Sequence, residues 1–236
     1  LKHYLKFYYS LGDVVLCPSE YTKGVLQSYG INRPIIPVSN GVDTAKFRFS
    51  AERRKKFRRL HGLDGMVPLS VGHLFIRKGV ETFVNVARRF PDLTFLWIGK
   101  LYSQFVDPRI TKVLKEAPPN VRFIGWIENI IDAYCGCDVF FFPTYCENQG
   151  IAVLEAAACG RPLLLRDIPV YEELKHGRVC LKAKTDEEFA HYLKEIIEDS
   201  KLRKQLQRGA RQFVKQHSLE KVGKKLKQIY EELLRR

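Results

Sequence analysis

Two glutamates lie eight positions apart in the stretch "ENQGIAVLEAAACGRP" (147–162). Glu147 belongs to a polar loop, and Glu155 lies in an apolar, alanine-rich segment that predicts a helix. Carboxylates are good acceptors for neighbouring hydroxyl groups, so one glutamate could hold a polyol at each end of a ligand. The alternative is that Glu155 only caps or pairs locally, since an unpaired buried glutamate is costly.

Two cations precede another predicted helix. Arg77 and Lys78 lie in "HLFIRKG" (73–79), just before the helix pattern "GVETFVNVARRF", and Gly150 stands where the Glu155 helix would begin. Helix N-termini offer unpaired N–H groups and a positive dipole end, which suit an anion. A diphosphate held by two helix starts and two cations would need no divalent metal. With a polyol at each end, this ligand is a nucleotide sugar, and no D-x-D pair of a metal-bridged site occurs.

The elements that must position these residues are short apolar strands alternating with amphipathic helix patterns. This order predicts an α/β fold with a doubly wound, Rossmann-like parallel sheet covered on both faces. Ligands bind such sheets beyond the carboxyl ends of the strands, where the loops described above would lie. The predicted strands are residues 13–19, 34–40, 67–72, 93–99, 120–125, 138–144, 162–167 and 178–183.

Length and composition are those of a globular protein of 236 residues. The sequence has no run of eighteen apolar residues, and its first residues do not follow the pattern of a secretory signal, so we expect a cytoplasmic protein. The six cysteines are scattered through predicted strands and helices, as reduced thiols would be. Cys135 and Cys137 lack a second pair at ligand spacing, so no metal site is expected.

The formal net charge of +14 concentrates in residues 52–62 ("ERRKKFRRLHG") and 201–236. Such a field attracts nucleic acid, anionic membranes and phosphorylated ligands alike. The alternative for each cluster is a solvated helix face, which is the simpler interpretation of residues 52–62. Nucleic acid is disfavoured because no aromatic residues interleave with the basic clusters and no zinc-finger or RNP-type motif is present.

The segment "ENQGIAVLEAAACGRPLL" resembles the E-x7-E signature of retaining GT-B glycosyltransferases, particularly glycosyltransferase family 4. "VLCPSEYTKGVLQSYGI" with "PIIPVSNGVDTAKF" is similar to the family's passage between domains, and "FIRKG" and "FIGWI" resemble its diphosphate and base loops. The resemblance covers nearly the whole chain. It implies that residues 40–217 form the C-terminal, nucleotide-sugar-binding domain of a GT-B fold. Residues 1–39 would be the end of the N-terminal acceptor domain and the linker, and 218–236 a helix returning toward that domain.

The resemblance also implies roles for individual residues. Glu147 would hold hydroxyls of the donor sugar, Glu155 would hold the ribose, and Lys78 with Arg77 would neutralise the diphosphate. The implied reaction is hexose transfer with retention through an oxocarbenium-like state, without a protein nucleophile, metal or cofactor. The remaining contacts would come from amides that meet sugar and phosphate and from residues that border the base: Asn148, Gln149, Gly150, Ile151, Trp126 and Ile127.

Two departures from the family pattern matter. His73 follows Gly72 where the family often has arginine, so either Arg77 supplies that charge or His73 donates a hydrogen bond. The chain also lacks most of the N-terminal acceptor domain, which a longer protein or a separate subunit would supply. By itself it is expected to bind donor and transfer poorly, because catalysis needs a positioned acceptor.

"LFIRKGVETFVNVARRFPDLTFLWIG" and "RDIPVYEE" are similar to bacterial diacylglycerol glucosyltransferases. This favours UDP-glucose as donor, a lipid or glycan as acceptor and a position at the inner face of an anionic membrane. Guanosine and adenosine diphosphate sugars stay open, because the base pocket would be mostly backbone and apolar contact. The alternatives are a non-catalytic nucleotide-sugar-binding or partner module and a glycoside hydrolase, whose two carboxylates would face each other roughly 5 to 9.5 Å apart.

Overall fold

The computed structural model describes residues 2–102 and 107–235. All eight predicted strands are present in this part of the chain, each shorter than predicted because its polar flanks belong to turns and loops. The strands are β1 (Val15–Cys17), β2 (Ile35–Pro37), β3 (Pro68–Val71), β4 (Phe95–Ile98), β5 (Val121–Gly125), β6 (Val139–Phe142), β7 (Leu163–Arg166) and β8 (Leu181–Ala183).

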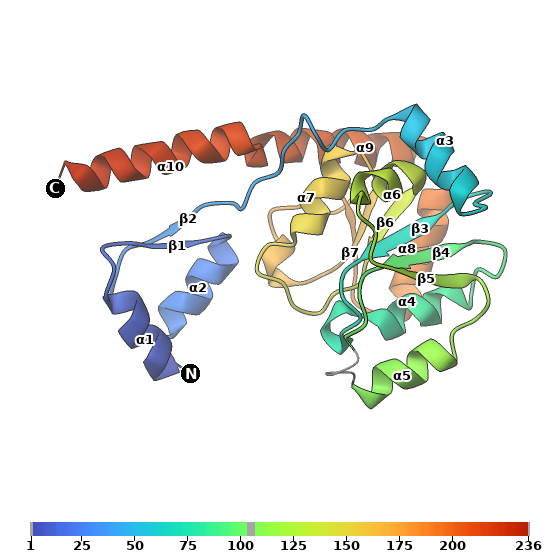
Figure 1. Cartoon of the computed structure of the whole chain (residues 1–236), viewed down its shortest axis with the longest axis horizontal. Helices are drawn as coiled ribbons and strands as arrows, with labels where there is room; N and C mark the ends of the chain where they lie inside the picture. The colour runs from blue at the N-terminus through green and yellow to red at the C-terminus, as the bar shows by residue number, and fades with distance from the viewer. Residues whose placement is uncertain (1, 103–106, 236) are drawn as a thin grey trace.

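Within the described residues the larger sheet contains six strands in the order β5-β4-β3-β6-β7-β8, and all adjacent pairs are parallel. The chain moves outward from β3 to β5, returns to β6 beside β3, and continues to the opposite edge (Figure 1). This reversal between β3 and β6 is the topological switch point, where the loops at the carboxyl ends separate and leave a crevice. The predicted doubly wound α/β fold is confirmed.

Helices cover both faces of this sheet. Its side chains alternate between two cores: Phe140 and Phe142 pack with α3, α6, α7 and α9, whereas Phe141 packs with α4, α5 and α8. The helices are α1 (Lys2–Ser10), α2 (Glu20–Ser28), α3 (Ala51–Leu60), α4 (Val80–Ala87), α5 (Pro108–Lys115), α6 (Ile130–Gly136), α7 (Ile151–Ala158), α8 (Asp186–Glu198), α9 (Ser200–Val214) and α10 (Leu219–Leu234).

Residues 2–37 form a small separate layer of α1, β1, α2 and β2. β1 and β2 pair in parallel and pack with α2 around Val15, Cys17 and Leu26. Helix α10 leaves the larger sheet and runs back beside this N-terminal segment (Figure 1). There the Lys225 ammonium group donates to the Pro37 carbonyl at 2.6 Å.

The basic segment 52–62 is not simply a solvated helix, which corrects the interpretation made from sequence. Arg54 and Arg58 of α3 pair with Asp138 at 2.7 and 3.1 Å, and Arg53 pairs with Asp132 of α6 at 2.6 Å. Arg54 also donates to the carbonyls of residues 135–137, the C-terminal end of α6, where a cation is favoured. Much of this positive charge is therefore used to attach α3 to the sheet.

All six cysteines lie within the described residues and none forms a disulfide. Five are buried and only Cys146 is exposed, which agrees with the prediction of reduced thiols used as small core residues. No helix in the described part of the chain combines the length and apolarity needed to cross a membrane.

Candidate functional site

Two neighbouring cavities of about 510 and 340 Å³ lie at the carboxyl edge of the sheet, next to the switch point between β3 and β6. They share a wall made by Val71, Gly72, Arg77 and Lys78. All eleven residues that the sequence suggested line one cavity or the other. The larger contains Glu147, Asn148, Gln149, Gly150 and Ile151, the smaller contains His73, Trp126, Ile127 and Glu155, and Arg77 and Lys78 border both.

The two cations reach the shared wall from the β3 loop (residues 72–79). This loop forms a short 3-10 turn at Ile76–Lys78 and ends at Gly79, whose φ of 76° opens α4. The Arg77 carbonyl accepts from the Tyr145 amide at 2.8 Å, and a Cβ on Gly79 would lie 2.2 Å from the Pro143 carbonyl oxygen. The β3 loop is therefore held tightly against the end of β6.

Glu147 lies in the β6 loop (residues 143–150), and its carboxylate meets both cations. The Lys78 ammonium donates to Glu147 Oε1, Thr144 Oγ1 lies 3.0 Å from the same oxygen, and Arg77 lies 3.9 Å away. The side chains of Lys78 and Glu147 are only 13% and 12% exposed, whereas that of Arg77 is 53% exposed. Because Lys78 is screened from water and borders both cavities, its charge would act strongly on an anion bound there.

Helix α7 begins at Gly150, as predicted, and its first turn faces the larger cavity. Gly150 has a φ of 81°, and a Cβ at this position would lie 2.5 Å from the hydroxyl of buried Tyr171. The first amides of a helix have no intrahelical acceptor and the dipole is positive there, so this end can bind an anion or a hydroxyl. A residue with a side chain at position 150 would disturb that arrangement.

The side chain of Gln149 is hydrogen-bonded to two residues of the stretch that follows β2. It is 8% exposed, its Oε1 accepts from the Asn40 amide at 2.9 Å, and its Nε2 donates to Ser39 Oγ at 2.7 Å. The carbonyl of Asn148 accepts from Ser19 Oγ of the N-terminal segment at 2.6 Å. Sequence analysis missed Ser19 and Ser39, and only a pairing signal between positions more than a hundred residues apart could have found them.

Glu155 lies in the second turn of α7 and lines the smaller cavity. The hydroxyl of fully buried Tyr134, from α6, donates to Glu155 Oε2 at 2.7 Å. Burial raises the pKa of Glu155, and this hydrogen bond opposes the increase. Glu155 therefore has a local partner, as the alternative from sequence required, while it also borders the cavity. Tyr134 was not singled out from the sequence.

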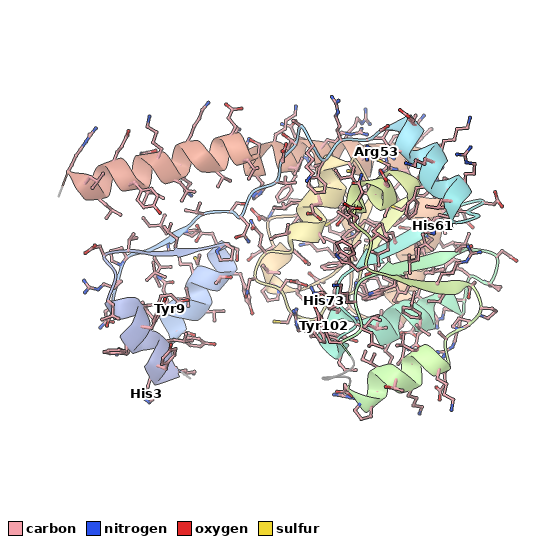
Figure 2. All side chains as sticks on the ribbon, viewed as in Figure 1. His3, Tyr9, Arg53, His61, His73 and Tyr102 are labelled. Atoms are coloured by element: carbon pink, nitrogen blue, oxygen red, sulfur yellow. The ribbon has the colours of Figure 1, made fainter. Side chains whose placement is uncertain are left out.

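Aromatic rings surround the outer part of the smaller cavity. Trp126 is 61% exposed, and the ammonium of Lys100 lies 5.4 Å from its ring centroid. His73 lies beside Tyr102, with 4.9 Å between ring centroids, on the side of the sheet that faces the N-terminal segment (Figure 2). Lys100 and Tyr102 were missed because neither belongs to a recognised motif. Stacking surfaces of this kind suit a planar ring system.

The chemical groups that the site offers to a ligand are two cations, two carboxylates, backbone amides and aromatic rings. In residues 2–102 and 107–235, no group of three or more His, Cys, Asp or Glu side chains is placed to hold a metal ion. The site can therefore offer positive charge to an anionic group at the shared wall and acceptors to hydroxyls in the cavity on either side.

The model of the family described as "Glycosyl transferases group 1" matches residues 52–213, which contain both cavities. The chain belongs to this family. It is 34% identical over 240 residues to a processive diacylglycerol alpha-glucosyltransferase of Acholeplasma laidlawii, covering 99% of this chain and 71% of that protein. It is 29% identical over 126 residues to an alpha-galactosylglucosyldiacylglycerol synthase of Streptococcus pneumoniae, covering 51% of this chain and 34% of that enzyme.

Solved structures place this group 1 glycosyltransferase chain in the GT-B fold. Anabaena HepE in complex with UDP superimposes with a TM-score of 0.90 at 18% identity, covering 98% of this chain and 68% of HepE. Sucrose-phosphate synthase from Thermosynechococcus elongatus gives a TM-score of 0.86 at 22% identity over 98% of this chain and 61% of that enzyme. The chain thus spans about two thirds of these GT-B proteins. Membership of a transferase family also removes the basis for the glycoside hydrolase alternative.

Proposed function

We propose that the protein is a family 4-type retaining transferase that moves a hexose, glucose in the first instance, from a uridine diphosphate sugar to a membrane lipid. The observation that carries this proposal is the pair of cavities joined at Arg77 and Lys78. A diphosphate at that wall directs the nucleoside to one side and the sugar to the other. The Acholeplasma relative, named as a diacylglycerol glucosyltransferase, supports the choice of sugar and acceptor.

In this arrangement the nucleoside occupies the smaller cavity. The carboxylate of Glu155 accepts hydrogen bonds from the ribose hydroxyls, and Trp126 and Ile127 border the base. His73 lines the same cavity, and its ring packs against Tyr102. The sugar occupies the larger cavity, where Glu147 and the amides at the start of α7 meet its hydroxyls.

The chemistry of transfer follows from the charges. The bond between the anomeric carbon and the β-phosphate oxygen breaks, and the electron pair leaves with the diphosphate. Lys78 and Arg77 stabilise the negative charge that develops on that leaving group. The acceptor hydroxyl forms the new bond to the anomeric carbon on the same face and gives its proton to the departing phosphate. The cations fill the role that a divalent metal has in other sites, so none is required.

The acceptor must approach from the side of the N-terminal segment, because that side of the cavities faces the rest of a GT-B enzyme. A lipid acceptor fits a protein of net charge +14, which an anionic membrane surface attracts. We therefore propose peripheral association with the inner face of the membrane. The competing hypothesis is a donor-binding module without activity of its own.

Calorimetric titration of the chain with UDP, GDP, ADP and their glucose conjugates tests the donor site. We expect binding of the uridine compounds, unchanged by EDTA and weakened in Lys78→Ala and Glu155→Ala. Absence of binding in a chain that unfolds cooperatively would contradict the proposal. Incubation with UDP-glucose and diacylglycerol vesicles then measures glycolipid formation, and NMR of the product determines the anomeric configuration. Donor binding without transfer would favour the module hypothesis for this chain.

A further inference from the structure

Two stretches of chain connect the N-terminal segment with the larger domain, and they pair with each other. The linker stretch (residues 38–42) and the return stretch (residues 216–219) form a parallel bridge between Val42 and Ser218. The Val42 amide donates to the His217 carbonyl at 2.9 Å, and the Leu219 amide donates to the Val42 carbonyl at 3.1 Å. Any rotation between the two parts of the molecule must bend at this pair of stretches, which we call the hinge.

Three polar side chains form a hydrogen-bonded chain at the hinge, which we call the hinge relay: His217, Ser39 and Gln149. Ser39 Oγ accepts from Gln149 Nε2 at 2.7 Å and from the Gly41 amide at 3.1 Å. Its single proton is then left for His217 Nδ1, which lies 3.0 Å away. His217 must therefore accept at Nδ1, so the ring is neutral and carries its proton on Nε2.

The relay ends in the β6 loop. Besides its bond to Ser39, Gln149 accepts from the Asn40 amide at 2.9 Å, so two adjacent linker residues fix one side chain. Gln149 lies between Asn148 and Gly150, whose backbone lines the larger cavity. Moving the linker relative to the return stretch would move Gln149, and with it the amides that face the cavity.

We propose that the hinge relay sets the position of the β6 loop, so that His217 acts as a positioning residue for the sugar half of the donor. The proposal rests on the proposed function, because it assumes that the larger cavity holds the sugar. His217 itself touches neither cavity wall of the donor site; its ring packs against Phe213 of α9, with 4.6 Å between centroids. In the described residues the β3 loop, which would hold the nucleotide half, is bonded to residues 145–147 of the β6 loop and makes no hydrogen bond to the three relay side chains.

Protonation of His217 should break the hydrogen bonding of the relay. Burial lowers the pKa of His217 below its ordinary value of 6.5, in agreement with a neutral ring. A proton on Nδ1 would make it a donor toward a hydroxyl that already accepts two hydrogen bonds, so one bond of the relay would break. Charged groups of both signs line the adjoining cavity of about 580 Å³ beside His217: Glu20, Glu172, Glu173, Lys175, Lys221 and Lys225.

The test compares UDP with UDP-glucose binding to four variants by calorimetry. His217→Ala and Ser39→Ala break the relay, His217→Asn keeps an acceptor oxygen near the position of Nδ1, and His191→Ala changes an exposed histidine on α8. We expect His217→Ala and Ser39→Ala to weaken UDP-glucose binding about tenfold, as loss of a buried hydrogen bond does, and UDP binding less than about twofold. His217→Asn should restore most of the loss, and His191→Ala should match the parent chain.

The pH dependence gives a second readout that a purely structural role would not move. As the pH falls below about 6.5, the preference of the parent chain for UDP-glucose over UDP should decline, because burial lowers the pKa of His217 and places its protonation there. In His217→Asn that decline should be absent. Equal losses for UDP and UDP-glucose, or unchanged binding of both, would overturn the relay. Failure of the parent chain to bind either compound would instead contradict the proposed function.

Discussion

The β3 and β6 loops end in the same way but are held by different contacts. Each ends at a glycine with positive φ that opens a helix, Gly79 at 76° and Gly150 at 81°. The β3 loop is attached within the larger domain, to residues 143–147 of the β6 loop: the Arg77 carbonyl accepts from Tyr145, and Lys78 donates to Glu147. The last residues of the β6 loop, Asn148 and Gln149, are attached instead to the other part of the molecule. Two loops with the same geometry thus have different dependence on the N-terminal segment.

The difference divides the proposed donor site into a rigid and an adjustable half. The cations proposed to bind the diphosphate are fixed within one domain, so they need no partner segment to be in place. The amides that would meet the sugar flank Gln149 and should follow the hinge, whereas the Glu147 carboxylate is bonded to Lys78 of the rigid half. Binding of the nucleotide should therefore survive changes at the hinge, and sugar recognition should report them.

The largest expected effect is a loss of folding stability when either glycine that ends a loop, Gly79 or Gly150, is replaced by alanine. Gly79→Ala would place Cβ 2.2 Å from a backbone oxygen, and we expect it to lower the free energy of unfolding by roughly 3 kcal/mol or more. Gly150→Ala meets a side-chain hydroxyl, that of Tyr171, and not backbone, so it should cost less, about 1 to 2 kcal/mol. Urea unfolding at equilibrium measures both.

Gly125→Ala is the matched control for this pair. Gly125 has a φ of 80°, yet a Cβ would meet nothing within 4 Å, so only the left-handed backbone costs energy, about 1 kcal/mol. If Gly79→Ala were as mild as this control, the β3 loop would not be rigidly packed and the comparison would fail.

The next effect is on nucleotide binding, from removal of the cation that both cavities share. Lys78→Met keeps an unbranched side chain that is one atom shorter, and removes the charge. We expect UDP and UDP-glucose to bind about a hundredfold more weakly, since hydrogen bonds to charged groups in screened sites are worth about 1.5 to 3 kcal/mol each. Lys194→Met, on the exposed face of α8, is the control. A loss limited to UDP-glucose would mean that Lys78 serves the sugar and not the diphosphate.

The positions of the strands along the chain and the loops that meet beside the cavities could be predicted from sequence because both depend on local patterns. Apolar runs such as residues 138–144 mark buried strands, and polar loops at their carboxyl ends must gather at one edge. Gly150 marked the start of α7 because a residue before a helix with close neighbours needs a positive φ and no side chain.

The hydrogen bonds and ion pairs that hold these elements together could not be predicted, because they join residues that are distant in sequence. Ser19 and Asn148 are 129 positions apart, and either residue would look ordinary in a loop. The interpretation of residues 52–62 as solvated was wrong for a similar reason: Asp132 and Asp138, which pair with its arginines, lie about eighty residues away. Charge alone does not show whether its partner is water or protein.

A more moderate effect is expected from Glu155→Gln, which should weaken binding and strengthen folding. The amide accepts hydroxyls less strongly than the carboxylate, so UDP affinity near neutral pH should fall about tenfold. Burial raises the pKa of Glu155 above its ordinary value of 4.5, so its ionisation lowers stability as the pH rises through that raised pKa. The neutral amide of the variant avoids this cost and can still accept from the Tyr134 hydroxyl.

The measurements are UDP titration and urea unfolding, each over a range of pH. The parent chain should lose affinity as the pH falls through the raised pKa of Glu155, and the variant should remain nearly constant, until the two converge in acid. Parallel pH profiles would exclude Glu155 from the ribose contact. The nucleoside would then have to bind outside the smaller cavity. Only the proposed sugar contacts of the β6 loop would remain to be compared.

The smallest effect is the most informative about the adjustable half. Thr22 Oγ1 lies 3.1 Å from the Asn148 carbonyl, beside Ser19, so Thr22→Val removes one of two hydroxyls from that contact and preserves its shape. We expect UDP-glucose affinity to fall by about twofold to fivefold, in proportion to one partly exposed hydrogen bond, with UDP affinity unchanged. Thr111→Val, on the exposed side of α5, should change neither. If Thr22→Val weakened UDP as much as UDP-glucose, the N-terminal segment would support the whole site, and the two loops would form a single unit.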